Sequence, residues 1–340
     1  RRQYQSIEKG DTMTLQKFDV SITNVSKGMA LMLILWHHLF YEQPDRGWLV
    51  YQSALLAKVC VGIYVILSGY GLAESAKSKS FNLLAFYKRR LVKLYMNYWF
   101  IAALFIPIGV FFMGRTLESV YGDGVYGKLL IQMLGVHMFT DVSYGYNATW
   151  WFMSLIIVLY ALFPLMFKLT KMFGLWFVAL CAILLFVPIP LINDWLFPFA
   201  VGIWLSQHNG FIAIFNWLDS LGSKRFLVLI ALTIFAAWYR QNGWLFDSIR
   251  ADTFFGILLI LLTTEIALLS PHLRKALEFI GIHSFNIFLF HTFIYYYYFP
   301  DFIYSFKYPV LIFAVLLGIC LIISMGIEKL KEVIGFNKIL

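Results

Sequence analysis

Ten apolar segments follow one another along the chain, and this repetition is the feature that most limits how it can fold. A helix needs about 20 mostly apolar residues to cross a bilayer core. Apolar residues make up 61% of the 340 residues and charged residues 13%, a balance that excludes an ordinary soluble protein. We therefore expect an all-α, polytopic membrane protein with about ten spans, at residues 26–41, 55–73, 91–113, 150–167, 173–187, 191–206, 226–238, 252–270, 280–298 and 309–327.

Lysine and arginine residues give these spans an orientation. The short cytoplasmic loops of membrane proteins are enriched in both. With the N-terminus placed inside, twenty of the 27 Lys and Arg residues fall on the cytoplasmic side, which predicts that both termini are cytoplasmic. The chain then divides into a cytoplasmic N-terminal segment (1–25), a transmembrane domain (26–327) and a cytoplasmic C-terminal tail (328–340). Basic loops facing anionic lipid explain the net charge of +9 without nucleic acid as a partner.

Two adjacent histidines, His37 and His38, lie within the first apolar segment. An ionisable ring at membrane depth costs free energy unless it has a partner, so such a residue is a functional candidate. The alternative is a neutral, hydrogen-bonded ring that serves packing. Lys27 and His38 are eleven positions apart, which places them nearly on one helix face and about 16 Å apart along the axis. His37 points about 100° away from that face.

A basic cluster, Lys88-Arg89-Arg90-Leu91-Val92-Lys93, opens the third span. Spacing alone favours the ordinary explanation, a positively charged anchor at the cytoplasmic surface. The alternative is a phosphate site. Arg90 and Lys93 are three residues apart and share a helix face, and a guanidinium can bind phosphate oxygens through two N–H groups at once.

Small or polar residues interrupt two further spans. Ser68 and Gly69 permit close helix packing or the approach of a ligand to the backbone, and packing is the simpler reading. Asn286 and His291 place polar groups within the ninth span. The three cysteines show no metal-type spacing, so we expect no metal site.

The longest outward connection, 114–149, precedes the fourth span. It is rich in glycine and aromatic residues and could form a lid or a binding groove, or be a simple surface connection. Its apolar stretch 129–139 is too short to cross a bilayer and is typical of a re-entrant or interfacial segment. Asn147, Trp150 and Trp151 lie where this connection meets the fourth span, a position at which tryptophan usually marks the membrane interface.

Taken in order, these segments resemble the acyltransferase-3 family of integral membrane O-acyltransferases, over about residues 18–327. The resemblance rests on Lys27-Gly28 with an apolar run to His38, Ser68-Gly69-Tyr70, Arg90-Leu91-Val92-Lys93, Trp150-Trp151 through Pro164, and Gly281 through His291. The interval from Lys27 selects His38 over His37. Asn24, Lys27 and Lys93 stand where many members have Asp, Arg and Arg, and lysine keeps the charge but lacks the planar fork.

The resemblance implies transfer of an acyl group, usually acetyl, from cytoplasmic acyl-CoA to a hydroxyl of an extracytoplasmic acceptor, commonly a cell-surface carbohydrate. His38 is then the catalytic residue, as general base or as acyl carrier. The expected residues for binding acetyl-CoA, or another acyl-CoA, are Lys27, Arg89, Arg90, Lys93, Ser68 and Gly69. Those expected to face the acceptor or to support His38 are His37, Asn147, Trp150, Trp151, Asn286 and His291.

The same resemblance implies a location in the cytoplasmic membrane of a bacterium, surrounded by membrane lipids, and is compatible with a homo-oligomer. A different function uses the same scaffold. A multi-pass transporter for a small solute or a lipid-linked sugar would employ Lys27 and His38 as substrate or proton sites, without any need for acyl-CoA.

Overall fold

A computed structural model describes residues 18–77, 82–140, 142, 144–187, 192–242 and 248–336. Within these ranges the regular secondary structure is helical, and each of the ten predicted segments lies largely on a helix. The helices are α1 (Val20–Phe40), η1 (Pro44–Arg46), α2 (Trp48–Ala57), α3 (Cys60–Lys77), α4 (Leu83–Phe112), α5 (Leu117–Tyr121), α6 (Val125–Met133), η2 (His137–Phe139), η3 (Ala148–Trp150), α7 (Trp151–Phe173), α8 (Leu175–Leu184), α9 (Asn193–Gln207), α10 (Gly210–Ser220), α11 (Lys224–Asn242), α12 (Ser248–Leu269), α13 (Pro271–Thr292), η4 (Phe293–Tyr298), α14 (Pro300–Tyr304) and α15 (Pro309–Val333).

Six helical stretches in the described part of the chain are long and apolar enough to cross a membrane: Trp48–Lys77, Leu83–Phe112, Ala148–Phe173, Ala251–Leu269, Pro271–Tyr298 and Pro309–Val333. The other four predicted spans fall on α1, α8, α9 and α11. Helices α8 and α9 have 10 and 15 residues, fewer than a bilayer core requires. Polar side chains lower the hydropathy of α1 and α11. The all-α architecture is confirmed, whereas ten as the number of spans stays a prediction.

The predicted segment boundaries shift at both ends of the chain. Helix α1 begins at Val20, where the Asp19 side chain accepts a hydrogen bond from the backbone N–H of Ile22 and caps the helix. Helix α15 continues to Val333, so the predicted tail 328–340 begins inside the last helix. Residues 1–17 of the predicted N-terminal segment and 337–340 of the tail lie outside the described residues.

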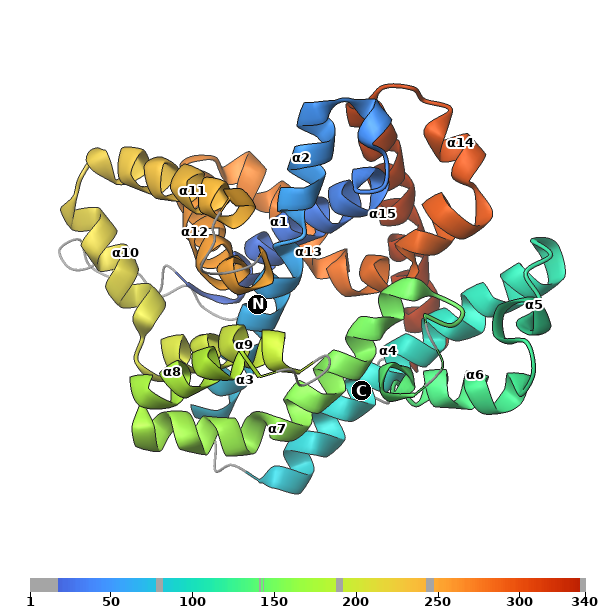
Figure 1. Cartoon of the computed structure of the whole chain (residues 1–340), viewed down its shortest axis with the longest axis horizontal. Coiled ribbons are helices and arrows are strands. Elements are labelled where there is room, and N and C mark those ends of the chain that lie inside the picture. The colour runs from blue at the N-terminus through green and yellow to red at the C-terminus, as the bar shows by residue number, and fades with distance from the viewer. Residues whose placement is uncertain are drawn as a thin grey trace.

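Helices α1 and α13 lie side by side in the middle of the molecule (Figure 1). Two glycines allow this contact, since a Cβ atom added to Gly28 would lie 2.0 Å from the carbonyl oxygen of Leu277, and one added to Gly281 would lie 1.9 Å from that of Asn24. The two helices run in the same direction, because Gly28 lies beside Leu277 and, further along both helices, His38 lies beside His291. This parallel packing is what brings two distant histidines together.

Two charged pairs tie α11 to α12. Arg225 of α11 lies 2.9 Å from Glu265 of α12, and at the opposite ends of the same two helices the buried Arg240 pairs with Asp252 and donates to the carbonyl of Leu55 (3.0 Å). Helices α11 and α12 are therefore antiparallel. The expected interfacial stretch 129–139 falls on α6 and η2, and α5 and α6 extend outward at one edge of the molecule (Figure 1).

Candidate functional site

A cavity of about 500 Å³ lies between α1, α3, α4, α7 and α13. Its walls follow α13 from Gly281 to Phe288 and α7 from Phe152 to Tyr160, which corresponds to about 12 Å of helix. Small-molecule sites commonly have volumes of about 300–1,000 Å³, so this cavity has the size of a binding site. Its lining residues are Asn24, Lys27, Tyr64, Leu67, Ser68, Gly71, Leu72, Arg90, Lys93, Leu94, Asn97, Phe152, Ile156, Tyr160, Gly281, Ile282, Ser284, Phe285 and Phe288.

Three cations line this cavity, and no carboxylate is among its described lining residues. Lys27 comes from α1, whereas Arg90 and Lys93 come from one face of α4, as their spacing predicted. Arg90 Nε is buried with no hydrogen-bond partner in the described part of the chain. A buried donor without a partner is costly, so it marks a position where a bound group with acceptor oxygens would be stabilised.

The structure separates the predicted donor-binding residues into two groups. Ser68 lines the cavity with Lys27, Arg90 and Lys93. Arg89 is exposed and is not among the lining residues. Gly69 faces α9 instead, where an added Cβ would lie 2.4 Å from the carbonyl oxygen of Phe199. Gly69 therefore serves helix packing, one of the two roles its residue type permits.

His38 lies beside His291 of α13, with 5.2 Å between the ring centroids. His291 is fully buried, and its Nδ1 is 3.0 Å from the backbone carbonyls of Ile287 and Phe288. Since a carbonyl oxygen only accepts, Nδ1 carries the proton and Nε2 carries the lone pair. That Nε2 is buried without a hydrogen-bond partner in the described ranges. The His291 ring thus places a free acceptor close to His38.

His37 occupies a different environment from its neighbour. Its Nδ1 lies 2.8 Å from the carbonyl oxygen of Ala54 in α2, and its ring stacks on Tyr41 with a centroid separation of 4.8 Å. One nitrogen of His37 is therefore occupied by a backbone contact that ties α1 to α2. His37 therefore has a packing role, which is the alternative that the sequence left open for the two histidines.

The end of the connection 114–149 and the start of the next helix dock on α13 on either side of His291. Asn147 Nδ2 and Trp150 Nε1 both donate to the carbonyl oxygen of Leu289, at 3.3 and 2.8 Å, and Thr292 donates to Asn147 Oδ1 (2.8 Å). The carbonyl oxygen of Leu289 is occupied by these two side chains, and the backbone N–H of Phe293 donates to the carbonyl oxygens of Phe290 and His291 rather than to Leu289. From Phe293 the chain continues as the π-helical segment η4. Asn147 and Trp150 therefore fix the backbone that carries His291.

Two other predicted supporting residues lie further from the histidine pair. Trp151 is part-buried and packs near Trp195, with ring centroids 6.2 Å apart. Asn286 belongs to a polar network next to the cavity. Its Oδ1 accepts from Lys331 Nζ (2.9 Å), and its Nδ2 donates to Glu328 of α15 (2.7 Å).

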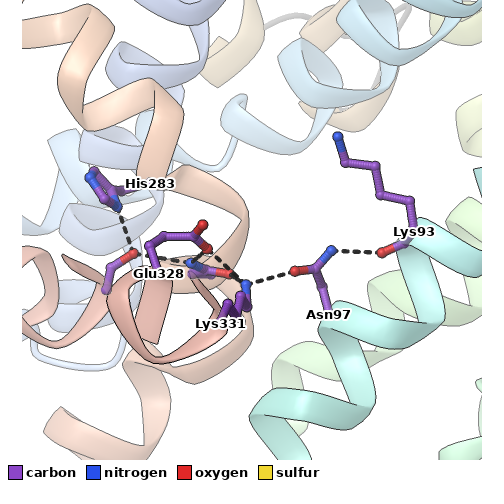
Figure 2. A network of polar contacts seen from close by, with 7 residues as sticks. Lys93, Asn97, His283, Glu328 and Lys331 are labelled. Atoms are coloured by element: carbon purple, nitrogen blue, oxygen red, sulfur yellow. Dashed lines mark hydrogen bonds and ion pairs between the residues drawn. The ribbon is translucent and has the colours of Figure 1, made fainter. Parts of the chain in front are cut away.

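Sequence reasoning missed the centre of this network, Lys331, which it counted as one of the cytoplasmic positive charges. Lys331 is 1% exposed and donates to Asn97 on α4 as well as to Asn286 and Glu328, as Figure 2 shows. The sequence did contain a signal for the burial of Lys331. Ser324 and Lys331 continue, at helical spacings of three and four residues, the face of α15 on which Leu316 and Cys320 are buried.

Comparison with known proteins identifies the family. A profile of the family described as "Acyltransferase domain" (acyltransferase-3) matches residues 23–329. The chain is 25% identical to "Acyltransferase MdmB" of Streptomyces mycarofaciens over 157 residues, which cover 44% of this chain and 40% of that protein, so the chain spans less than half of that relative's length. No solved structure gives a significant match. Because the family profile covers most of the sequence, the chain belongs to the acyltransferase-3 family.

Proposed function

We propose that this protein is an integral membrane O-acyltransferase of a bacterial cytoplasmic membrane. It takes an acyl group, acetyl in the first instance, from cytoplasmic acyl-CoA and passes it to a hydroxyl of an extracytoplasmic carbohydrate. One observation supports this function above the others. A cavity of suitable size has Lys27, Arg90 and Lys93 in its wall and extends to Phe288, whose ring centroid lies 6.3 Å from that of His291.

The chemistry of the lining suits an acyl-CoA. The three cations and the unpartnered Arg90 Nε would bind the phosphates, since charge-assisted hydrogen bonds to phosphate oxygens are among the stronger ones in proteins. Besides the cations and the amides of Asn24 and Asn97, the walls combine apolar side chains with the hydroxyl groups of Tyr64, Ser68, Tyr160 and Ser284. Such a surface would hold an extended pantetheine arm with its thioester directed along α1 toward His38.

His38 has two routes to the product. As a general base, it takes the proton of the acceptor hydroxyl while the oxygen attacks the thioester carbonyl; the C–S bond breaks, and the thiolate receives the proton from His38. As an acyl carrier, a ring nitrogen of His38 attacks the carbonyl and the C–S bond breaks to release the thiolate; the acceptor oxygen then takes the acyl group from His38, and the hydroxyl proton passes to the thiolate. In either route the lone pair of His291 Nε2 offers His38 a hydrogen-bond acceptor.

The proposed direction of transfer depends on the ten-span topology with both termini in the cytoplasm. It is supported by the alternating directions of the helices around the site. Helix α13 runs parallel to α1 and antiparallel to α15, since Phe313 near the start of α15 lies beside Trp36, at the end of α1 that meets His291. Ser324, further along α15, lies beside His283, which comes before His291 on α13. This is the pattern expected when α1 and α13 leave the cytoplasm and α15 returns to it.

The proposal is tested with purified full-length protein in lipid nanodiscs and acetyl-CoA labelled in the acetyl group. His38→Ala should leave acetyl-CoA binding within about twofold and reduce acetyl transfer or hydrolysis by about 10²–10⁴-fold, the usual contribution of a general base. His37→Ala is the matched control, with much smaller loss of turnover because its nitrogen holds Ala54. His291→Leu should lower turnover without weakening binding.

Arg90→Ala should weaken acetyl-CoA binding by about 10–100-fold, since a hydrogen bond to a charged group contributes about 1.5–3 kcal/mol. Failure of the wild-type protein to bind, hydrolyse or transfer from acetyl-CoA would reject the enzyme and favour the transporter. Full turnover in His38→Ala together with its loss in His37→Ala would show that the other ring is catalytic.

A further inference from the structure

The three N–H groups of the Lys331 ammonium all donate hydrogen bonds, to acceptors on three different helices. It donates to Asn97 Oδ1 on α4 (2.7 Å), to Asn286 Oδ1 on α13 (2.9 Å) and to Glu328 Oε1 on its own helix α15 (2.8 Å). Three acceptors match the three N–H groups of a lysine. The aromatic rings of Phe100 and Phe336 lie 5.6 and 5.9 Å from Nζ and shield it.

Lys331 itself does not line the cavity, but its partner Asn97 does. Asn97 has both ends of its amide engaged, because Oδ1 accepts from Lys331 while Nδ2 donates to the backbone carbonyl of Lys93 (2.7 Å). The two contacts fix the orientation of the amide, with oxygen toward the ammonium and nitrogen toward the carbonyl. Lys331 is thereby linked through one residue to the helical turn that carries Lys93.

In Figure 2 the contact to Lys93 ends at its backbone carbonyl, and the Lys93 side chain extends from α4 without a contact to the other residues drawn. On the other side, Asn286 Nδ2 donates to Ser324 Oγ (3.3 Å), which also contacts His283 Nδ1 (2.9 Å). The network thus joins α4 to the α13 wall of the cavity through α15. It sets the distance between the turn bearing Lys93 and the wall formed by Ser284 and Phe285.

Stability alone does not account for a charge at this position. A buried ion pair often contributes no more to stability than apolar residues of the same volume, and sometimes less. The rest of the inward stripe of α15 is mostly apolar, with Leu316, Cys320 and Ile327 at neighbouring positions. A charge retained there, bonded to a residue of the cavity wall, is better explained by placement of α4 than by stability.

We propose that Lys331 is a positioning residue for donor binding: through Asn97 it holds the turn of α4 that presents Lys93 to the phosphates of acyl-CoA. The inference rests on the proposed function. It concerns a residue just beyond the region 23–329 that the family profile matches. Lys331 does not touch the donor, so its loss should affect how well phosphates are bound and leave the acyl-transfer step almost unchanged.

The test compares two donors with purified protein in nanodiscs. Acetyl-CoA carries phosphates, whereas S-acetylpantetheine has the thioester and arm without them. Lys331→Met should raise the KM for acetyl-CoA about tenfold, with kcat within about twofold, and leave the KM for S-acetylpantetheine unchanged. Lys329→Met is the matched control, since Lys329 is exposed on the same helix and pairs with Glu332 (2.7 Å) in the same i,i+3 pattern.

A double-mutant cycle tests the route through Asn97. In an Asn97→Ala background, Lys331→Met should change the KM for acetyl-CoA by less than about twofold, because the link to α4 is already broken. If Lys331→Met does not fold, Asn97→Ala alone should still raise the KM for acetyl-CoA and spare that for S-acetylpantetheine. It leaves Lys331 bonded to Glu328 and Asn286.

Three results would overturn the inference while leaving the proposed function intact in a wild-type protein that uses acetyl-CoA. These are an unchanged KM in Lys331→Met, an equal rise in KM for both donors, and independent effects of Lys331 and Asn97 in the cycle. Absence of any acetyl-CoA binding by the wild type would instead reject the proposed function, and with it the positioning role.

Discussion

Neighbouring residues of one type have different environments in this protein. His37 is bonded to a backbone carbonyl of α2, while His38, one position on, lies beside a second histidine from α13. Arg89 is exposed, while Arg90 lines the cavity and its Nε is buried with no hydrogen-bond partner among the described residues. In each case about 100° of helix rotation separates the two residues. The role of a residue is thus set by the face it occupies and by which helix lies opposite.

His137, in η2 outside the membrane-spanning helices, gives a prediction at the same scale. It is fully buried, neither ring nitrogen has a hydrogen-bond partner in the described part of the chain, and burial lowers its pKa from 6.5 to about 4. The folded protein therefore keeps His137 neutral at a pH where the unfolded chain binds a proton. Its contribution to stability is present above about pH 6.5 and is lost as the pH falls toward 4.

We expect amide hydrogen exchange in α6 and η2, corrected for the intrinsic pH dependence, to become faster relative to α13 between pH 6.5 and pH 4. His137→Leu should remove most of this dependence, because leucine has no proton to bind. His272→Leu, which changes an exposed histidine, is the control. A pH dependence that survives in His137→Leu would show that another group is responsible.

At the scale of whole helices, the contact between α1 and α13 decides the geometry of the site. Asn24 and Lys27 of α1 and Gly281 and Ser284 of α13 all line the cavity, so the separation of the two helices sets its width. The separation in turn depends on the absence of a side chain at Gly28 and Gly281. Docking of Asn147 and Trp150 on the same helix further along holds His291 in register with His38.

Gly28→Ala should force α1 and α13 apart, since its Cβ would lie 2.0 Å from the carbonyl oxygen of Leu277. Overpacking of this kind costs about 1–3 kcal/mol of folding free energy. We expect a lower melting temperature in detergent and weaker acetyl-CoA binding. Gly318→Ala on α15 is the control, because its Cβ would meet nothing within 4 Å. Equal melting temperatures for the two variants would show that the crossing tolerates a methyl group.

At the scale of the molecule, the predicted topology places the cavity lined by Lys27, Arg90 and Lys93 on the cytoplasmic side. Cysteine labelling in intact cells tests the orientation, using Asp123→Cys between α5 and α6 and Ser223→Cys between α10 and α11, both exposed positions. The native Cys60, Cys181 and Cys320 are buried, so background labelling should be low. A membrane-impermeant maleimide should label residue 123 directly and residue 223 only after permeabilisation. The opposite pattern would invert the donor and acceptor sides.

Much of the architecture follows from the sequence because helix formation in a bilayer depends on the composition of each segment by itself. Apolar length predicted where the helices lie, and the periodicity of 3.6 residues predicted that Lys27 and His38, or Arg90 and Lys93, share a face. The short helices α8 and α9 were visible only as apolar runs. Helix ends shifted because Asp19 caps α1 at its N-terminus, and because α15 continues through Glu328 and Lys331 to Val333, beyond its apolar core.

The sequence by itself determined an all-helical membrane protein of the acyltransferase-3 family, with a basic group and a histidine on one face of its first span. The tertiary structure alone decided which residues meet: His38 with His291, Lys331 with Asn97, and Gly69 with α9 rather than with the cavity. The reason is that periodicity acts within one helix, whereas contacts between helices depend on the packing of segments that are up to 253 positions apart in these pairs.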